Sequence, residues 1–277
     1  MGETETLDLG RRGFLASAAI AAAASGLALS SAPAGAEPIN RSVSSVRFGG
    51  NSLRFADLTH RLTRQFNFDP THPRIDMQSV DGSGVAVGMK MHRLLLIEHT
   101  GTHLDAPSHF GSEFKSVGDL PLSDLVVPLA VISIADRAAQ SRNAQLEPDD
   151  VLRWEGRHGR LPAGCCVAMD SGSDPLARPE LRASDGKFAS TGFSPEAAKM
   201  LAQSRDVKGI AVDAMTIDSG PHVPSYPVHQ FWLRSGRWGV EGITNLSAVP
   251  ASGALLIVGA APIADATGIP IRALALF

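Results

Sequence analysis

Cysteine and aromatic residues are scarce in this chain. Its 277 residues include 2 cysteines and 1 tyrosine, and aromatic residues make up 5%. Cys165 and Cys166 are neighbours in an apolar run, and neighbouring side chains on a strand point to opposite faces, so a disulfide between them is geometrically poor. We interpret both as small core residues, with a redox pair as the alternative. A chain without a disulfide framework depends on its hydrophobic core, and this chain is long enough to build one.

A strong charge of one sign and a long apolar run are also missing. The formal net charge is −3 at pH 7, so we expect neither nucleic acid nor an anionic membrane surface as a partner, because both favour clustered Lys and Arg. The Ala-rich stretch at residues 14–29 has 16 residues. A membrane-spanning helix needs about 20 strongly apolar residues. We therefore expect no stable membrane anchor.

The N-terminus resembles a twin-arginine export signal. Arg11 and Arg12 precede the Ala-rich stretch, and Ala-Gly-Ala at residues 34–36 is typical of a signal peptidase site. We expect residues 1–36 to be cleaved after export through the twin-arginine translocation machinery to the periplasm or the exterior. A helix belonging to the folded domain is the alternative. Residues 37–54 would then form an N-terminal extension, and residues 55–277 a single folded domain.

Short apolar runs and a few helical segments predict an α/β fold, a single domain with a mixed β-sheet core and peripheral helices. We expect strands at residues 94–98, 126–134, 165–170, 209–213, 254–259 and 271–276. We expect helices at residues 148–155, at 195–203 with Ser194 as the N-cap, and at 228–233, ending before Gly236.

Residues 98–110 hold three of the chain's nine histidines and one aspartate. His99, His103, Asp105 and His109 all have odd numbers and would share one face of an extended chain. Imidazole nitrogens and carboxylate oxygens are ligands for Zn²⁺ and Mn²⁺, and the absence of cysteine disfavours a closed structural zinc site. We interpret the cluster as a site for metal binding and proton transfer. The alternative is a set of ordinary polar loop histidines.

The same segment must bend to form one site. Gly101 and Pro107 disfavour a helix. A straight strand would separate His99 from His109 by roughly 30 Å, which is too far for one metal centre. Bending is easiest at Gly101, which accepts unusual dihedral angles, and at Pro107, which ends strand pairing.

The pattern His-x-Gly-Thr-His-x-Asp-x-Pro-x-His at residues 99–109 resembles the hallmark of the cyclase family of metal-dependent hydrolases, which includes bacterial kynurenine formamidases and isatin hydrolases. Asp-Leu-Thr-His at residues 57–60, the segment at 212–218, and His229 with Glu241 resemble further family motifs in the same order. The resemblance runs from about residue 55 to the C-terminus. Two features depart from it: the usual pair of distal histidines is Val228-His229 here, and a Trp-Pro-Gly-like stretch is replaced at residues 65–70.

The resemblance implies a swivelling β/β/α fold and a homo-oligomer. It also implies one or two divalent ions, Zn or Mn, and a proton-transfer role for His109. The implied metal ligands are His99, His103, Asp105, His229 and Glu241.

The implied reaction is hydrolysis of a small-molecule amide, because such ions activate water and polarise a carbonyl while a histidine supplies the proton for the departing nitrogen. We expect an N-formyl aromatic amide such as N-formylkynurenine, which would belong to tryptophan catabolism. The alternatives are a cyclic amide such as isatin, or an exported protein that binds a metal or small ligand without turnover. Candidates for the walls of an aromatic pocket are Phe66, Phe68, Tyr226 and Trp232, although helical aromatic residues more often belong to the core.

Overall fold

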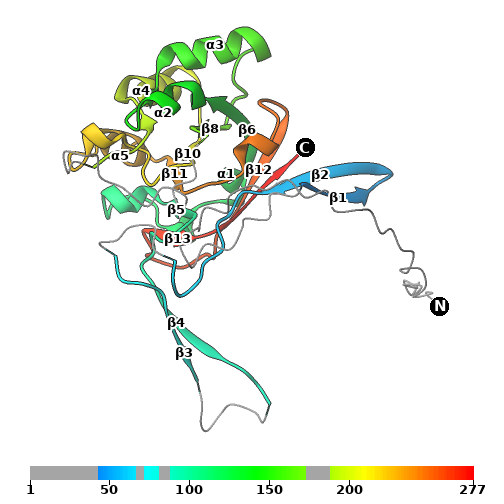
Figure 1. Cartoon of the computed structure of the whole chain (residues 1–277), viewed down its shortest axis with the longest axis vertical. Helices are drawn as coiled ribbons and strands as arrows, with labels where there is room; N and C mark the ends of the chain where they lie inside the picture. Colours follow the sequence, from blue (N-terminus) through cyan, green and yellow to red (C-terminus); the bar gives the residue numbers. More distant parts are fainter. Residues whose placement is uncertain (1–42, 67–71, 81–87, 173–187) are drawn as a thin grey trace, which may run out of the picture. The chain divides into compact units, whose positions relative to one another are not determined.

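A ten-stranded mixed sheet organises the chain in the computed structural model (Figure 1). Its strands are β1 (Val43–Phe48), β2 (Asn51–Asp57), β5 (His103–Asp105), β6 (Val126–Ser133), β8 (Cys166–Asp170), β10 (Gly209–Val212), β11 (Trp238–Glu241), β12 (Ala254–Gly259), β13 (Gly268–Pro270) and β14 (Arg272–Leu276). Their order is β1-β2-β14-β12-β6-β8-β10-β11-β5-β13. This matches the predicted mixed sheet.

The structure describes residues 43–66, 72–80, 88–172 and 188–277. The predicted export signal at residues 1–36, most of the predicted extension and Phe68 lie outside these ranges. None of the helices within the described ranges has the length and apolar character needed to span a bilayer.

The middle of the sheet is parallel. Strands β6, β8, β10 and β11 pair in parallel, and the other pairings are antiparallel. Parallel neighbours need long crossovers, which usually contain helices. The crossovers here hold α2 (Ala135–Gln140), α3 (Pro148–His158), α4 (Pro195–Ser204) and α5 (Pro227–Arg234). In chain order, α2 and α3 join β6 to β8, α4 joins β8 to β10, and α5 joins β10 to β11.

The parallel middle of the sheet is buried on both faces, as strands β8, β10 and β11 show. On one face the helices contribute Trp154, Leu201 and Trp232 to a hydrophobic cluster. Side chains alternate between the two faces at the start of β8, so Cys165, just before the strand, packs in the helix-side cluster and Cys166 in the opposite one. Both cysteines are free and fully buried, which confirms their prediction as core residues.

Most of the predicted elements form close to their expected bounds. Helix α4 begins at Pro195, as predicted. Ser194 is its N-cap, and the Ser194 hydroxyl accepts a hydrogen bond from the Ala197 amide at 3.1 Å. Helix α3 runs further than predicted, to His158, and Gly159 is its C-cap. Short elements complete the fold: α1 (Leu122–Leu125), β7 (Gln145–Leu146), β9 (Gly192–Phe193), and the 3₁₀ turns η1 (Pro107–Phe110), η2 (Val117–Asp119), η3 (Gly220–His222) and η4 (Leu246–Ala248).

The predicted buried strand at residues 94–98 is wrong. The strand there is β4 (His92–Leu95), which pairs with β3 (Asp76–Ser79) in a separate two-stranded sheet. Leu94 is 55% exposed and Leu95 is 69% exposed. The apolar run was correctly predicted to be extended, but its composition carries no information about which sheet it joins.

Gly209 on β10 offers a test of the packing between neighbouring parallel strands. A methyl group at this position would overlap the six-membered ring of the buried Trp238 on β11. We expect Gly209→Ala to lower the free energy of unfolding by about 1–3 kcal/mol, as overpacking does, measured by urea denaturation. The matched control is Gly156→Ala at an exposed position on α3, where a methyl group meets nothing within 4 Å. Helix propensity predicts that the control gains about 0.5–1 kcal/mol. Equal stabilities would contradict the packing argument.

Candidate metal centre

The antiparallel pairing of β5 with β11 builds the base of the site. Glu241 is the register partner of His103, and Gly239 is the partner of Asp105. Because Leu104 belongs to the core on the far face, its neighbours His103 and Asp105 point to the face that carries α5. Ligands in open α/β sheets bind at the carboxyl ends of the parallel strands, and Glu241 is the last residue of β11.

A tight bend brings His99 to the same place. Gly101 has φ of 70°, and a side chain there would collide with Leu62. Gly268 on β13 leaves room for the ring of His99, since a methyl group at 268 would lie 2.8 Å from His99 Nδ1. Pro107 opens the turn η1. The predicted bending points, Gly101 and Pro107, are therefore confirmed.

His229 approaches from the opposite side, on the first turn of α5. The side chain of Asp218, which is completely buried, accepts hydrogen bonds from the backbone amides of Val228 at 2.8 Å and His229 at 3.0 Å. The same carboxylate lies 2.6 Å from His229 Nδ1. Asp218 thus fixes both the start of the helix and the direction of the imidazole.

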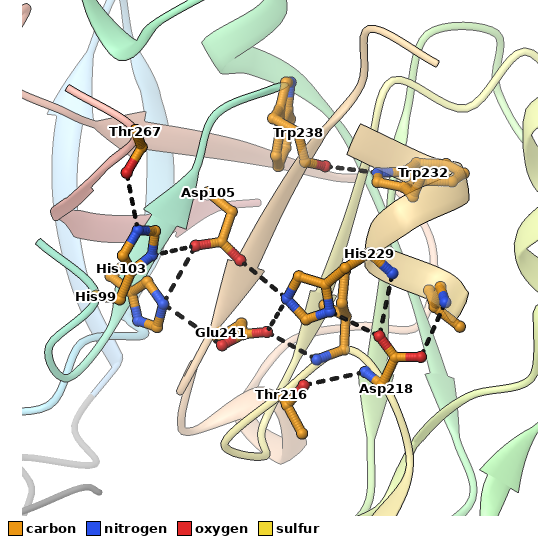
Figure 2. A network of polar contacts seen from close by, with 12 residues as sticks. His99, His103, Asp105, Thr216, Asp218, His229, Trp232, Trp238, Glu241 and Thr267 are labelled. Carbon is orange, nitrogen blue, oxygen red and sulfur yellow. Dashed lines mark hydrogen bonds and ion pairs between the residues drawn. The ribbon is translucent and has the colours of Figure 1, made fainter. Parts of the chain in front are cut away.

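The polar atoms of these residues converge (Figure 2). His103 Nε2 lies 3.3 Å from Asp105 Oδ1 and 3.4 Å from Glu241 Oε2. His229 Nε2 lies 3.0 Å from Glu241 Oε1 and 3.6 Å from Asp105 Oδ2. His99 Nδ1 lies 2.6 Å from Asp105 Oδ1. The structure therefore brings together all five predicted ligands.

These donors form two overlapping groups that share Asp105. One contains His99 and His103, the other His229 and Glu241, and within each group the donor atoms lie within 4.8 Å of one another. Three or four nitrogen and oxygen donors at this spacing suit a borderline or hard divalent ion.

The hydrogen bonds behind the rings show that a cation fits. His103 Nδ1 lies 2.9 Å from the carbonyl oxygen of Gly101, and His229 Nδ1 faces the Asp218 carboxylate. Those oxygens only accept, so each Nδ1 carries the proton and each neutral ring turns the Nε2 lone pair toward the two shared carboxylates. The Nε2 lone pairs of His103 and His229 then face carboxylate oxygens, so hydrogen-bond acceptors lie on both sides of each contact. His103 Nε2 and Asp105 Oδ2 are buried atoms that make no hydrogen bond, as expected of metal donors.

Without an ion, protons must supply the missing positive charge. Burial opposes ionisation of His103, but the neighbouring carboxylates of Asp105 and Glu241 outweigh it and raise its pKa to about 10. Burial likewise opposes a charged His229, yet the carboxylates of Asp105, Asp218 and Glu241 around it raise its pKa well above the usual value. The pKa of Asp105 is held well below its usual value, against burial, by His103 above all. A divalent ion would take the place of these protons, so metal binding at this site is coupled to proton release.

His109 lies beside the five candidate ligands, but its ring nitrogens do not belong to either group of donor atoms. Its ring centroid is 3.9 Å from that of His99 and 6.1 Å from that of His229. Burial is the largest influence on its pKa and, despite the opposing charge of Asp105, lowers it to about 4. His109 is therefore neutral near pH 7 and free to take up a proton.

The predicted aromatic residues separate into different surroundings. Tyr226 is next to the site, with its ring centroid 5.5 Å from that of His229. Phe66 is 7% exposed and packs behind Gly101 and against His60. Trp232 is fully buried, and its indole N–H donates to the carbonyl of Trp238 at 2.8 Å, which places it in the core.

Two functional residues were missed at the sequence level. Asp218 falls within a recognised segment, but nothing there indicates its partner eleven residues later. Phe110 directly follows the histidine motif, and its ring lies 5.1 Å from that of His229 and 6.4 Å from that of Tyr226. The position of Phe110 directly after His109 was the feature of the sequence that could have identified it.

Replacing Asp218 tests the role of the carboxylate behind His229. In Asp218→Asn the side-chain amide can donate to Nδ1, which would turn the proton to Nε2 and remove the lone pair. We expect metal affinity to fall about 10- to 100-fold, as for other partners of metal-bound histidines, measured by calorimetric titration with Zn²⁺. Asp136→Asn, on the exposed start of α2, is the control. Unchanged affinity in Asp218→Asn would show that His229 is not a donor.

Comparisons with known proteins agree on one family. The family model described as Cyclase matches residues 56–219. The isatin hydrolase of Roseibium aggregatum is 33% identical over 193 residues, which cover 66% of this chain and 73% of that protein. The kynurenine formamidase of Salinibacter ruber is 27% identical over 195 residues, covering 70% of this chain and 81% of that protein.

A solved structure agrees as well. Isatin hydrolase A from Labrenzia aggregata, bound to benzyl benzoate, superimposes with a TM-score of 0.72 at 31% identity, covering 81% of this chain and 93% of the other. With the sheet, the bent histidine segment and these matches in agreement, the chain belongs to the cyclase family of hydrolases.

Proposed function

We propose that this protein is a metal-dependent amidohydrolase that cleaves the C–N bond of a small aromatic amide. The observation that carries the proposal is the set of imidazole lone pairs aimed at two buried carboxylates, with the neutral His109 beside them. His99, His103, Asp105, His229 and Glu241 would hold one or two divalent ions, Zn²⁺ or Mn²⁺.

The residues divide the work of amide hydrolysis between them. When bound, a divalent ion polarises the carbonyl and makes water more acidic. His109 accepts the proton that the attacking water loses and returns it to the departing nitrogen, which would otherwise leave as a very basic anion. Its low pKa keeps it in the form that can accept. Phe110 and Tyr226 provide apolar surface next to the donors, suited to a flat aromatic group.

Two substrates follow from the relatives. The isatin hydrolase shares more identity with this chain, which supports a cyclic amide such as isatin. The kynurenine formamidase, of which this chain covers a larger share, supports an N-formyl aromatic amide such as N-formylkynurenine. Both reactions add water across an amide next to an aromatic ring, and the same donors serve each.

The first experiment measures turnover of both compounds by the purified chain, stripped of metal and then loaded with Zn²⁺ or Mn²⁺. We expect hydrolysis of at least one compound, loss of activity with a chelator, and recovery when metal is restored. Stoichiometric metal binding without hydrolysis of either compound would reject both named substrates. Tight metal binding with no activity on a wider panel of aromatic amides would favour the alternative of an exported metal-binding protein.

His109 separates an enzyme from a binding protein. We expect His109→Ala to lower kcat by about 10²- to 10⁴-fold, because the general acid and base is lost, while metal content stays at the wild-type level. Kinetics and elemental analysis on the same preparation provide both values. His158→Ala, an exposed histidine on α3, should leave both unchanged. If metal content falls together with kcat, His109 is a ligand, and its assigned role is wrong.

A further inference from the structure

Two residues outside the donor set lie directly behind His99. The Thr267 hydroxyl oxygen is 3.1 Å from His99 Nε2 and 2.6 Å from Glu98 Oε2. The backbone amide of Thr267 also donates to Glu98 at 3.1 Å. The carbonyl of Thr267 accepts from the Ala106 amide at 2.9 Å, so the backbone at 267 is tied to the chain just after β5. Thr267 therefore holds a fixed place relative to His99.

The direction of each hydrogen bond follows from the chemistry of the groups. A carboxylate only accepts, so the short contact to Glu98 uses the single proton of the Thr267 hydroxyl. The hydroxyl oxygen keeps its lone pairs, and one of them faces His99 Nε2. His99 must then carry its proton on Nε2. In the neutral ring, Nδ1 is left with the lone pair.

That lone pair points at a second acceptor. His99 Nδ1 lies 2.6 Å from Asp105 Oδ1, and the ring cannot swing away easily, because the backbone of Gly268 lies against its edge. Without a metal, a second proton on Nδ1 would join the two atoms as a hydrogen bond, and a bound divalent ion would take the place of that proton. His99 thus differs from His103 and His229, whose Nδ1 atoms are held from behind and whose Nε2 atoms face the carboxylates.

We propose that Glu98 and Thr267 are positioning residues that fix the Nε2–H tautomer of His99 and make Nδ1 its donor atom for a divalent ion. The proposal rests on the metal site of the proposed function. Its mechanism is the one by which a carboxylate orients metal-bound histidines elsewhere, with a threonine hydroxyl inserted as a relay. The relay fixes which nitrogen of His99 is available. It does not contact the substrate.

The test compares Thr267→Val, which keeps the shape but removes the hydroxyl, with Thr267→Ser, which keeps the hydroxyl. We expect Thr267→Val to weaken Zn²⁺ binding about 10- to 100-fold in calorimetric titration, and Thr267→Ser to stay near wild type. Glu98→Gln should weaken binding less than Thr267→Val, since its amide oxygen still accepts from Thr267. Thr59→Val is the matched control, because its hydroxyl bonds to the backbone of Ala273. It should lower stability without changing affinity.

A second measurement reads the tautomer directly and does not depend on activity. Long-range ¹H–¹⁵N spectra of the Zn²⁺-loaded protein, with His99→Gln used for assignment, should show His99 protonated at Nε2 and bound through Nδ1. In Glu98→Gln and Thr267→Ser this pattern should persist. Binding of His99 through Nε2, or wild-type affinity in Thr267→Val, would overturn the proposal. Failure of the wild-type chain to bind Zn²⁺ at all would instead overturn the proposed function.

Discussion

Two buried carboxylates set the requirements for the rest of the site. Asp105 is 1% exposed and Glu241 is 6% exposed, and taking each charge out of water costs several kcal/mol unless it is compensated. Proteins usually compensate a buried anion with Arg or Lys. Among the residues that the structure describes, the groups that meet these two carboxylates are imidazoles and the backbone amide of Ile217, which donates to Glu241 at 2.9 Å. Imidazoles can give up their protons to make room for an ion. That choice of partners converts a cost in stability into affinity for a metal.

The mixed sheet explains why ligands from distant parts of the chain meet. Strands β10 and β11 run in parallel, so the loop after β10, which carries Asp218, and the end of β11, which carries Glu241, open at the same edge. Strand β5 is antiparallel to β11 and begins with His103 at that edge. Helix α5 lies between β10 and β11 in the chain and returns His229 to the site. The pairing of β5 with β11 therefore positions the site, and β13 supports it from the other side of β5.

The sequence pointed to the candidate ligands but not to the residues that support them, and the reason is physical. His99, His103 and Asp105 stand out because few other uses require these side chains at this spacing, and the family resemblance implied His229 and Glu241. Their partners are ordinary residues. Thr267 stands 168 residues from His99, and only the tertiary fold places it there. Periodicity also could not distinguish the exposed β4 from a core strand, because a hairpin of two strands and a large sheet both use apolar extended segments.

The aromatic residues illustrate the same limit. Composition near His229 made Trp232 a candidate for the pocket wall, with the core as the commoner place for a helical aromatic residue. The structure places its ring in the core beside β11, three positions after His229 on the same helix. Phe110 meets His229 from a separate turn, where no helical spacing would indicate it.

The export signal and the oligomeric state stay predictions of the sequence.

The charge of the site explains why the number of ions matters for turnover. With neutral histidines, Asp105, Glu241 and the Asp218 carboxylate behind His229 contribute three negative charges, of which one divalent ion balances two. A second ion would leave an excess of positive charge that stabilises the negative charge developing on the carbonyl oxygen. The same excess would hold the product, because hydrolysis of either amide releases a carboxylate. If two ions bind as proposed, His229 and Glu241 would set the affinity of the second position and, through it, the balance between faster chemistry and slower product release.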